Sequence, residues 1–278
     1  MSSLLAALTF LTVFPISIIP GAKQWTPTRQ ELSNSRAYYP AVGLLLGLML
    51  VSLERCCSEV FPDYLSAAVL LVSLIVVNRG LHLDGLMDTC DGIFGGFTPE
   101  RRLEIMRDSQ VGAFGVAGAA GVLILKYGAL VSLLGLSGSG VPDSGIQWPL
   151  LIFPMLSRWS MVVALGAFPY VRSQGLGSPF HQSGKLRQGG ILWPTAAAGI
   201  TAIAASVLLG SIAGVGMLVG ASLIAWVLGR SVAAKLGGLT GDSYGAINEV
   251  TEMLALMAVV AIASHGWVEP LTSFLDLT

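Results

Sequence analysis

Charged residues are scarce in this chain. They make up 11% of its 278 residues, whereas a soluble domain carries about 25%. So few charged side chains cannot cover the surface of a water-soluble globule. The hydrophobic content of 54% and the mean hydropathy of +0.75 argue equally against a disordered chain or a soluble coiled coil. Because the 15 Lys and Arg are balanced by 16 Asp and Glu, the chain has no excess of positive charge and no nucleic-acid partner is expected.

Cysteine is scarce as well. Cys56 and Cys57 are adjacent and Cys90 stands alone, so the chain has neither a C-x-x-C pair nor an even-numbered disulfide framework. Glycine, by contrast, is abundant, with 34 residues. Small residues are typical of closely packed membrane helices. The composition therefore predicts an integral membrane protein embedded in a lipid bilayer.

Charge-free stretches predict where the chain crosses the bilayer, because about 20 apolar residues span its hydrocarbon core. They indicate about seven transmembrane helices, between Arg36 and Glu54, between Asp63 and Asn78, at 112–136, at 148–168, twice within 188–229 and at 249–264. A turn at 210–216 is expected to separate the two helices of the long run. We therefore expect an all-α, polytopic helical bundle formed by a single domain, 1–278.

The apolar N-terminus is too short for a span and is ended by Pro15 and Pro20, which predicts an interfacial helix. Lys and Arg concentrate in the segments 20–36, 78–110, 169–190 and 230–248, whereas the intervening segments hold only Arg55. The positive-inside rule places the first group in the cytoplasm. Lys126, within a predicted span, is expected to snorkel toward the interface.

Three aspartates give the strongest chemical signal. Asp84, Asp88 and Asp91 are spaced i, i+4 and i+7, so a helix places them on one face. Their mutual repulsion would be relieved by a cation, and oxygen-only ligands favour Mg²⁺ or Mn²⁺. The alternative is a solvated acidic face on a cytoplasmic helix. A carboxylate not bound to metal could take the proton of an attacking hydroxyl, so all three are candidate catalytic and metal-binding residues.

The neighbours of this triplet have both functional and structural interpretations. Asn78, Arg79 and His82 are candidates for substrate binding, or serve as interface anchors and structural hydrogen-bonding groups. Thr98 and Pro99 predict the start of a short helix over 99–110. Glu104, Arg107 and Asp108 share one face of that helix, where Glu104 and Asp108 are candidate metal ligands and Arg107 a candidate substrate contact, or all three form local salt bridges.

Other charged positions lie further along the chain. Asp242 and Glu249 belong to an acidic cluster near the last helix, which predicts a second metal site, a substrate clamp or helix capping. Arg158 lies inside an apolar helix, where arginine usually pairs with an acid or a phosphate. Lys185 lies in a basic, glycine-rich loop, interpreted as a lid for an anionic substrate or as an ordinary flexible loop.

Carboxylates with a hard metal beside basic residues at a membrane face favour phosphoryl or nucleotidyl transfer. The residues Asp88 to Gly92 also match the D-x-x-D-G opening of CDP-alcohol phosphotransferases, but the rest of that signature does not follow. A divalent-cation transporter is a further alternative, in which the acids would form a permeation site.

Several longer stretches resemble the cobalamin synthase family, the adenosylcobinamide-GDP ribazoletransferases. The most specific are NRGLHLDGLMDTCDGIFGG at 78–96 and ERRLEIMRDSQVGAFG at 100–115. Further matches are FLTVFPI, AYYPAVGLLLG, LSRWSMV and GLTGDSYGAINEVTE. The resemblance therefore covers nearly the whole chain.

This resemblance implies a Mg²⁺-dependent enzyme of the bacterial cytoplasmic (inner) membrane whose site faces the cytoplasm. It would join adenosylcobinamide-GDP to α-ribazole or its phosphate and release GMP. The acidic motif of the family falls on His82, Asp84, Asp88 and Asp91, and its later blocks fall on Glu104, Arg107, Asp108, Asp242 and Glu249. Met87 and Cys90 depart from the family pattern without removing a carboxylate. Whether the chain forms a homo-oligomer is left open by the sequence.

Overall fold

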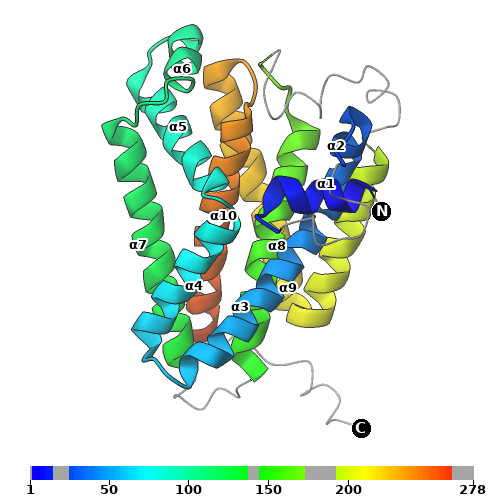
Figure 1. Cartoon of the computed structure of the whole chain (residues 1–278), viewed down its shortest axis with the longest axis vertical. Helices are drawn as coiled ribbons and strands as arrows, with labels where there is room; N and C mark the ends of the chain where they lie inside the picture. Colours follow the sequence, from blue (N-terminus) through cyan, green and yellow to red (C-terminus); the bar gives the residue numbers. More distant parts are fainter. Residues whose placement is uncertain (1, 15–24, 137–143, 173–191, 265–278) are drawn as a thin grey trace.

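The computed structural model describes residues 2–14, 25–136, 144–172 and 192–264. These residues fold into a bundle of helices, and the only β-pairing among them is an isolated bridge between Tyr170 and Leu239. The helices are α1 (Ser2–Leu11), α2 (Arg29–Ser35), the 3₁₀ turn η2 (Arg36–Tyr38), α3 (Tyr39–Ser58), α4 (Asp63–Val77), α5 (Leu81–Gly95), α6 (Pro99–Ile105), α7 (Ala113–Gly135), α8 (Ser144–Ala167), α9 (Leu192–Leu236) and α10 (Gly241–Ser264). The predicted all-α membrane bundle is confirmed (Figure 1).

Five helical stretches of the described chain are long and apolar enough to cross a membrane. They are Arg29–Ser58, Ala113–Gly135, Trp148–Ala167, Gly214–Leu236 and Gly241–Ile262. A sixth results if α4 and α5 are counted as one broken span. The remaining predicted span corresponds to the first part of α9, where the structure describes only some of the side chains.

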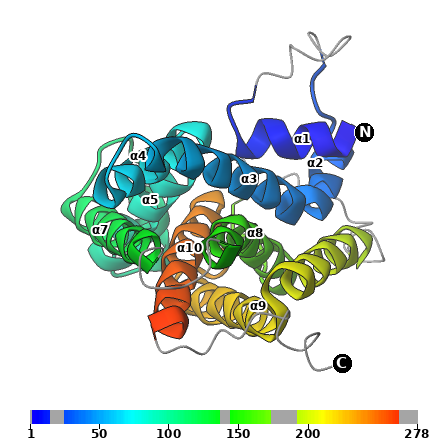
Figure 2. The same ribbon diagram turned by 90° about the horizontal axis from the view of Figure 1, so that it is seen from below.

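Helix α9 folds back on itself. The indole N–H of Trp159, on α8, donates to the Ser222 hydroxyl at 2.9 Å, and the same ring lies against Gly199. A straight helix would separate Gly199 from Ser222 by about 35 Å, so the two arms must both return to α8 (Figures 1 and 2). This agrees with the expectation of two membrane helices within the uncharged run.

The predicted second span is broken. Helix α4 is only 15 residues long, which is too short to cross a bilayer unaided. Arg79 and Gly80 both adopt positive φ angles, of 55° and 65°, and the chain bends by 86° between α4 and α5. Gly80 adopts this backbone region without strain, which favours a turn at this point of the chain, whereas Arg79 adopts it as a non-glycine residue. The acidic helix α5 is thereby directed away from the axis of α4.

The N-terminal helix α1 lies across the bundle rather than along it (Figure 1). At ten residues it cannot span a bilayer, which fits the interfacial helix expected from the sequence. Two bonds to the turn after α4 hold its C-terminal end. The Val13 N–H donates to the Val77 carbonyl at 2.7 Å, and the Arg79 guanidinium donates to the Thr9 carbonyl at 2.8 Å.

Helices α8 and α10 occupy the centre of the bundle (Figure 2). Helix α10 packs on α5, α7, α8 and α9, and α8 packs on α3 and α9. The approach of α3 to α8 is close because Gly43 and Gly47 present no side chain, and a Cβ at either position would overlap the backbone of α8. Such small residues let membrane helices pack backbone to backbone.

A leucine at position 47 should therefore force α3 and α8 apart. Gly47→Leu is expected to lower the free energy of unfolding by about 1–3 kcal/mol, the usual cost of overpacking. Gly121→Leu is the matched control, because Gly121 lies within a long helix with open space around its Cα. Thermal unfolding of both variants in detergent measures the difference. Equal melting temperatures would show that the α3–α8 contact is not tight.

Candidate active site

The candidate site forms where α5 crosses α10. Two glycines make the crossing close, since a Cβ on Gly85 would lie 2.8 Å from the Asp242 carbonyl oxygen and one on Gly245 would lie 3.0 Å from the His82 carbonyl oxygen. The backbones therefore touch here. As a result, the polar side chains that flank Gly85 on α5 are brought beside the first turn of α10.

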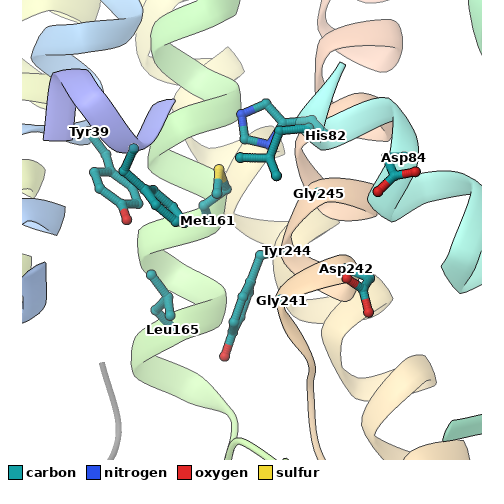
Figure 3. A pocket seen from close by; sticks show the side chains of 11 residues that line it. Tyr39, His82, Asp84, Met161, Leu165, Gly241, Asp242, Tyr244 and Gly245 are labelled. Atoms are coloured by element: carbon teal, nitrogen blue, oxygen red, sulfur yellow. The ribbon is translucent and has the colours of Figure 1, made fainter. Parts of the chain in front are cut away.

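A cavity of about 80 Å³ opens at this crossing (Figure 3). One wall is polar and comes from α5 and α10, which contribute His82, Asp84 and Asp242. The opposite wall is largely apolar and comes from α1, α3 and α8. Its members are Phe10, Tyr39, Met161 and Leu165. The cavity thus places carboxylates opposite a surface suited to an aromatic or aliphatic group.

The predicted aspartates are on one helix, as expected, but they have different surroundings. Asp84 is exposed and also lines an open depression of about 420 Å³ beside Arg79. Asp88 is half-buried, and the charges of Asp84, Asp91 and Asp242 all act on it. Asp84 and Asp88 make no hydrogen bond or ion pair through their carboxylates within the described residues. Both are therefore available to a ligand.

Asp242 joins these acids from the start of α10. Its Oδ2 lies 2.9 Å from the Arg172 guanidinium, which also donates to the Met106 carbonyl at 3.1 Å. The Thr240 hydroxyl approaches the same carboxylate at 3.4 Å. Among the described residues, a single arginine thus partly neutralises a group of three carboxylates, which leaves an excess of negative charge in this part of the structure.

Asp91 is committed to the fold. Its buried carboxylate accepts from the backbone N–H groups of Gly112 and Gly115, both at 2.8 Å, and so satisfies the first turn of α7. Its negative charge is also favourable at a helix N-terminus. Only glycine fits at these two positions, because a Cβ would collide with the carboxylate. Asp91 therefore fixes the end of α5 to the beginning of α7.

Alanine at position 91 should consequently reduce stability as well as activity. Asp91→Ala removes two charge-assisted hydrogen bonds and is expected to cost about 2–3 kcal/mol, while Asp91→Asn retains one acceptor and should cost less. Asp84→Ala, which removes an exposed and unbonded carboxylate, is the control. Melting temperatures in detergent should fall in the order Asp84→Ala, Asp91→Asn, Asp91→Ala. An unchanged melting temperature for Asp91→Ala would refute this assignment.

Helix α6 begins as predicted, with the Thr98 hydroxyl accepting from the Arg101 N–H. It ends at Ile105 rather than at 110, because the chain must turn to bring Gly112 to Asp91. Glu104 is exposed and pairs with Arg101 at 2.7 Å. Arg107 and Asp108 lie beyond the helix and are also exposed. Glu104 and Asp108 line a cleft of about 300 Å³ that also contains Asp91.

A buried ionic cluster joins α7, α8 and α10, and of its contacts the sequence predicted only that Arg158 pairs with an acid or a phosphate. Lys126 contacts Glu249 at 2.7 Å and Glu252 at 2.5 Å, and Glu252 also pairs with Arg158. The Ser157 hydroxyl and the Asn248 amide donate to the same Glu252 oxygen. The four charged side chains are at most 7% exposed. The expectation that Lys126 snorkels is therefore wrong, because two carboxylates hold its ammonium group inside the bundle.

The same cluster accounts for two residues that the sequence offered as candidates. Glu249 was expected near the start of the last helix, but α10 already begins at Gly241, where Thr240 and Ser243 cap each other's backbone N–H groups at 3.2 Å. Glu249 thus faces Lys126 in the interior rather than the cavity. Arg158 is fully buried against Glu252. In this structure neither residue lines the cavity of the α5–α10 crossing.

The three polar residues that precede the aspartates also differ in burial and in hydrogen bonding. His82 is 2% exposed and lines the cavity, and its Nε2 has no hydrogen-bond partner within the described residues. Asn78 is buried at the end of α4. Arg79 is exposed and bonded to the Thr9 carbonyl. Lys185 lies outside the described residues.

The donor set at the crossing suits a hard cation that binds with its substrate. Within the described residues, no three His, Cys, Asp or Glu side chains are close enough together to hold one metal ion. Mg²⁺ is commonly held by one or two carboxylates, several waters and the phosphates of a substrate. Asp84, Asp88 and Asp242 offer such carboxylates beside an open cavity. The residues therefore fit a magnesium ion that binds together with a phosphorylated substrate.

A carboxylate-lined cavity at one end of a bundle of membrane-spanning helices defines an integral membrane enzyme rather than a structural membrane protein. Comparison with known proteins gives its kind: the chain belongs to the family described as Cobalamin-5-phosphate synthase, whose model matches residues 3–260. No solved structure matches the chain.

Curated relatives extend over nearly the whole chain. It is 39% identical over 257 residues to the adenosylcobinamide-GDP ribazoletransferase of Desulfitobacterium hafniense (strain Y51), covering 92% of this chain and 96% of the relative. The protein of the same name from Syntrophobacter fumaroxidans is 38% identical, covering 92% and 97%. The one from Ectopseudomonas mendocina is 39% identical, covering 91% and 96%. The resemblance noted from the motifs is confirmed.

Proposed function

We propose that this enzyme transfers the phosphate-linked cobinamide of adenosylcobinamide-GDP to α-ribazole or to α-ribazole phosphate and releases GMP. The observation that carries the proposal is a cavity lined by Asp84 and Asp242, with Asp88 close enough for their charges to act on it, in a chain similar over nine-tenths of its length to ribazoletransferases. The distribution of Lys and Arg supports a site on the cytoplasmic side of the inner membrane.

In the proposed reaction, a ribose hydroxyl oxygen of the ribazole attacks the phosphorus attached to the cobinamide. A new P–O bond forms, the P–O bond to the bridging oxygen of the diphosphate breaks, and GMP leaves with that oxygen. The hydroxyl proton passes to a carboxylate. Asp84 and Asp88 are the candidates for this base, because neither carboxylate is engaged by another group of the described protein. Arg172 orients Asp242 beside them.

One or two of the carboxylates of Asp84, Asp88 and Asp242 would hold Mg²⁺ together with the substrate diphosphate. When bound, the ion would offset the charge that otherwise repels the diphosphate from three carboxylates and would stabilise the leaving phosphate. The apolar wall of Tyr39, Met161 and Leu165 excludes water from the side opposite the acids. It thereby favours the ribose hydroxyl over hydrolysis.

Turnover by the purified full chain in detergent tests this proposal. Adenosylcobinamide-GDP, α-ribazole or its phosphate, and Mg²⁺ should yield a cobalamin product and an equal amount of GMP, and EDTA should stop both. Folded protein that forms no product with metal present would contradict it. Use of a CDP-linked donor would instead indicate a CDP-alcohol phosphotransferase. Metal flux into vesicles without nucleotide release would indicate a transporter.

A further inference from the structure

Arg36, in the turn between α2 and α3, is a buried cation without a counter-ion among the residues that the structure describes. Its side chain is 0% exposed, and none of its Nε, NH1 and NH2 atoms has a hydrogen-bond partner within the described residues. The hydroxyl of Ser33, three residues earlier on the same face, is equally buried and equally unpartnered. In the described part of the chain, the donors of both side chains are thus enclosed without an acceptor.

This arrangement is unlike that of the other buried cations. Lys126 and Arg158 are the other two cationic side chains buried in the described part of the bundle, and each is paired with a glutamate. An unpaired charge in the interior costs several kcal/mol and is not retained for stability. An anion that binds beside Arg36 would remove this cost.

The position of Arg36 connects it with the cavity. Arg36 lies near Tyr39 and Tyr244, and both tyrosines line the cavity together with Asp84 and Asp242, whereas Arg36 does not line it itself. Tyr39 lies on the wall opposite the acids (Figure 3). A substrate anion in the cavity therefore has carboxylates on one side. Beyond the opposite wall lies Arg36, the only buried and unpaired cation of the described residues.

We infer that Arg36, assisted by Ser33, is a receptor for a phosphate group of the substrates, an inference that rests on the proposed transferase function. A guanidinium group binds two phosphate oxygens at once through its planar array of donors. The phosphate can come from a phosphorylated acceptor, as in α-ribazole phosphate, or from the diphosphate of the donor. In the first case Arg36 holds the acceptor on the side away from the acids, so that the reacting groups meet between the two walls.

The first measurement is thermal unfolding of the full chain in detergent, without turnover. Arg36→Met should raise the melting temperature of the ligand-free protein by a few degrees, because it removes an isolated charge. GDP or α-ribazole phosphate should stabilise the wild type, and this stabilisation should disappear in Arg36→Met. Arg29→Met, which removes an exposed arginine of the same segment, is the control and should behave as wild type.

The second measurement is steady-state kinetics. If Arg36 binds the acceptor phosphate, Arg36→Met should raise KM for α-ribazole phosphate at least about ten-fold and leave KM for α-ribazole and for adenosylcobinamide-GDP unchanged. If it binds the donor diphosphate, KM for adenosylcobinamide-GDP should rise instead. In either case Arg36→Lys, which keeps the charge without the planar array, should give an intermediate KM.

Three results would overturn the inference. They are a lower ligand-free melting temperature for Arg36→Met, unchanged KM values for both phosphorylated substrates, and a wild type stabilised by neither GDP nor α-ribazole phosphate. If Arg36→Met does not accumulate as folded protein, it counts as the first of these. A wild type that binds these compounds but releases no GMP would contradict the transferase function and leave the anion site standing.

Discussion

Alanine at position 88 is expected to lower kcat for GMP release by about a thousand-fold, the size of a lost general base or of comparable charge stabilisation. Asp88 is the half-buried centre of the carboxylate group formed with Asp84 and Asp242. Its carboxylate has no hydrogen-bond or ion-pair partner among the described residues, so the melting temperature should stay unchanged. The measurement is GMP release by chromatography under saturating substrate.

Glu59→Ala is the control for this variant. It removes an exposed carboxylate just after α3, beyond the cavity-lining residues, and should retain full activity. Asp84→Ala should resemble Asp88→Ala. Activity of Asp88→Ala within ten-fold of the wild type would show that the chemistry does not depend on this carboxylate, and the proposed site would then have to be abandoned.

The second large effect concerns stability. Glu252 is fully buried and is the one carboxylate that contacts both Lys126 and Arg158 within the described residues. Its replacement by alanine leaves two buried cations with Glu249 as the remaining acid. Such a loss costs about 3–5 kcal/mol. Glu252→Ala should therefore show a large fall in melting temperature in detergent, or should fail to accumulate in the membrane.

Arg101→Gln provides the matched comparison, because it breaks an ion pair that is more than half exposed on both sides. Its effect on the free energy of unfolding should stay below about 1 kcal/mol. Removing both a cation and the acid, as in Glu252→Ala with Arg158→Met, should recover part of the loss. If Glu252→Ala is as stable as the wild type, the cluster does not hold α7, α8 and α10 together.

Local signals in the sequence predicted the helices well. Charge-free runs located most of the long helices, and Thr98 followed by Pro99 predicted the start of α6. The aspartate spacing correctly predicted that Asp84, Asp88 and Asp91 share one helix. These features depend on residues close together in the chain, so the pattern alone determines them.

Contacts between distant segments could not be predicted in the same way. Nothing near Lys126 indicates that Glu249 and Glu252 pair with it, because those acids are more than a hundred residues away in sequence. Asp91 carries the same carboxylate as Asp88, yet only the position of α7 commits it to backbone bonds. Arg36 looked like one of several loop cations, and only burial distinguishes it. The one sequence feature that could have indicated its burial is its position directly before a long apolar stretch.

The residues for catalysis and the residues for substrate selection lie on different walls of the cavity. The carboxylates reside on α5 and α10, whereas Met161 and Leu165 come from α8 and face them across the opening. These two side chains are apolar and do not belong to the group of carboxylates. They can therefore be replaced by larger or smaller side chains without changing the acids. A search for variants that attach a different lower base to the corrinoid should begin there, with the catalytic carboxylates left as they are.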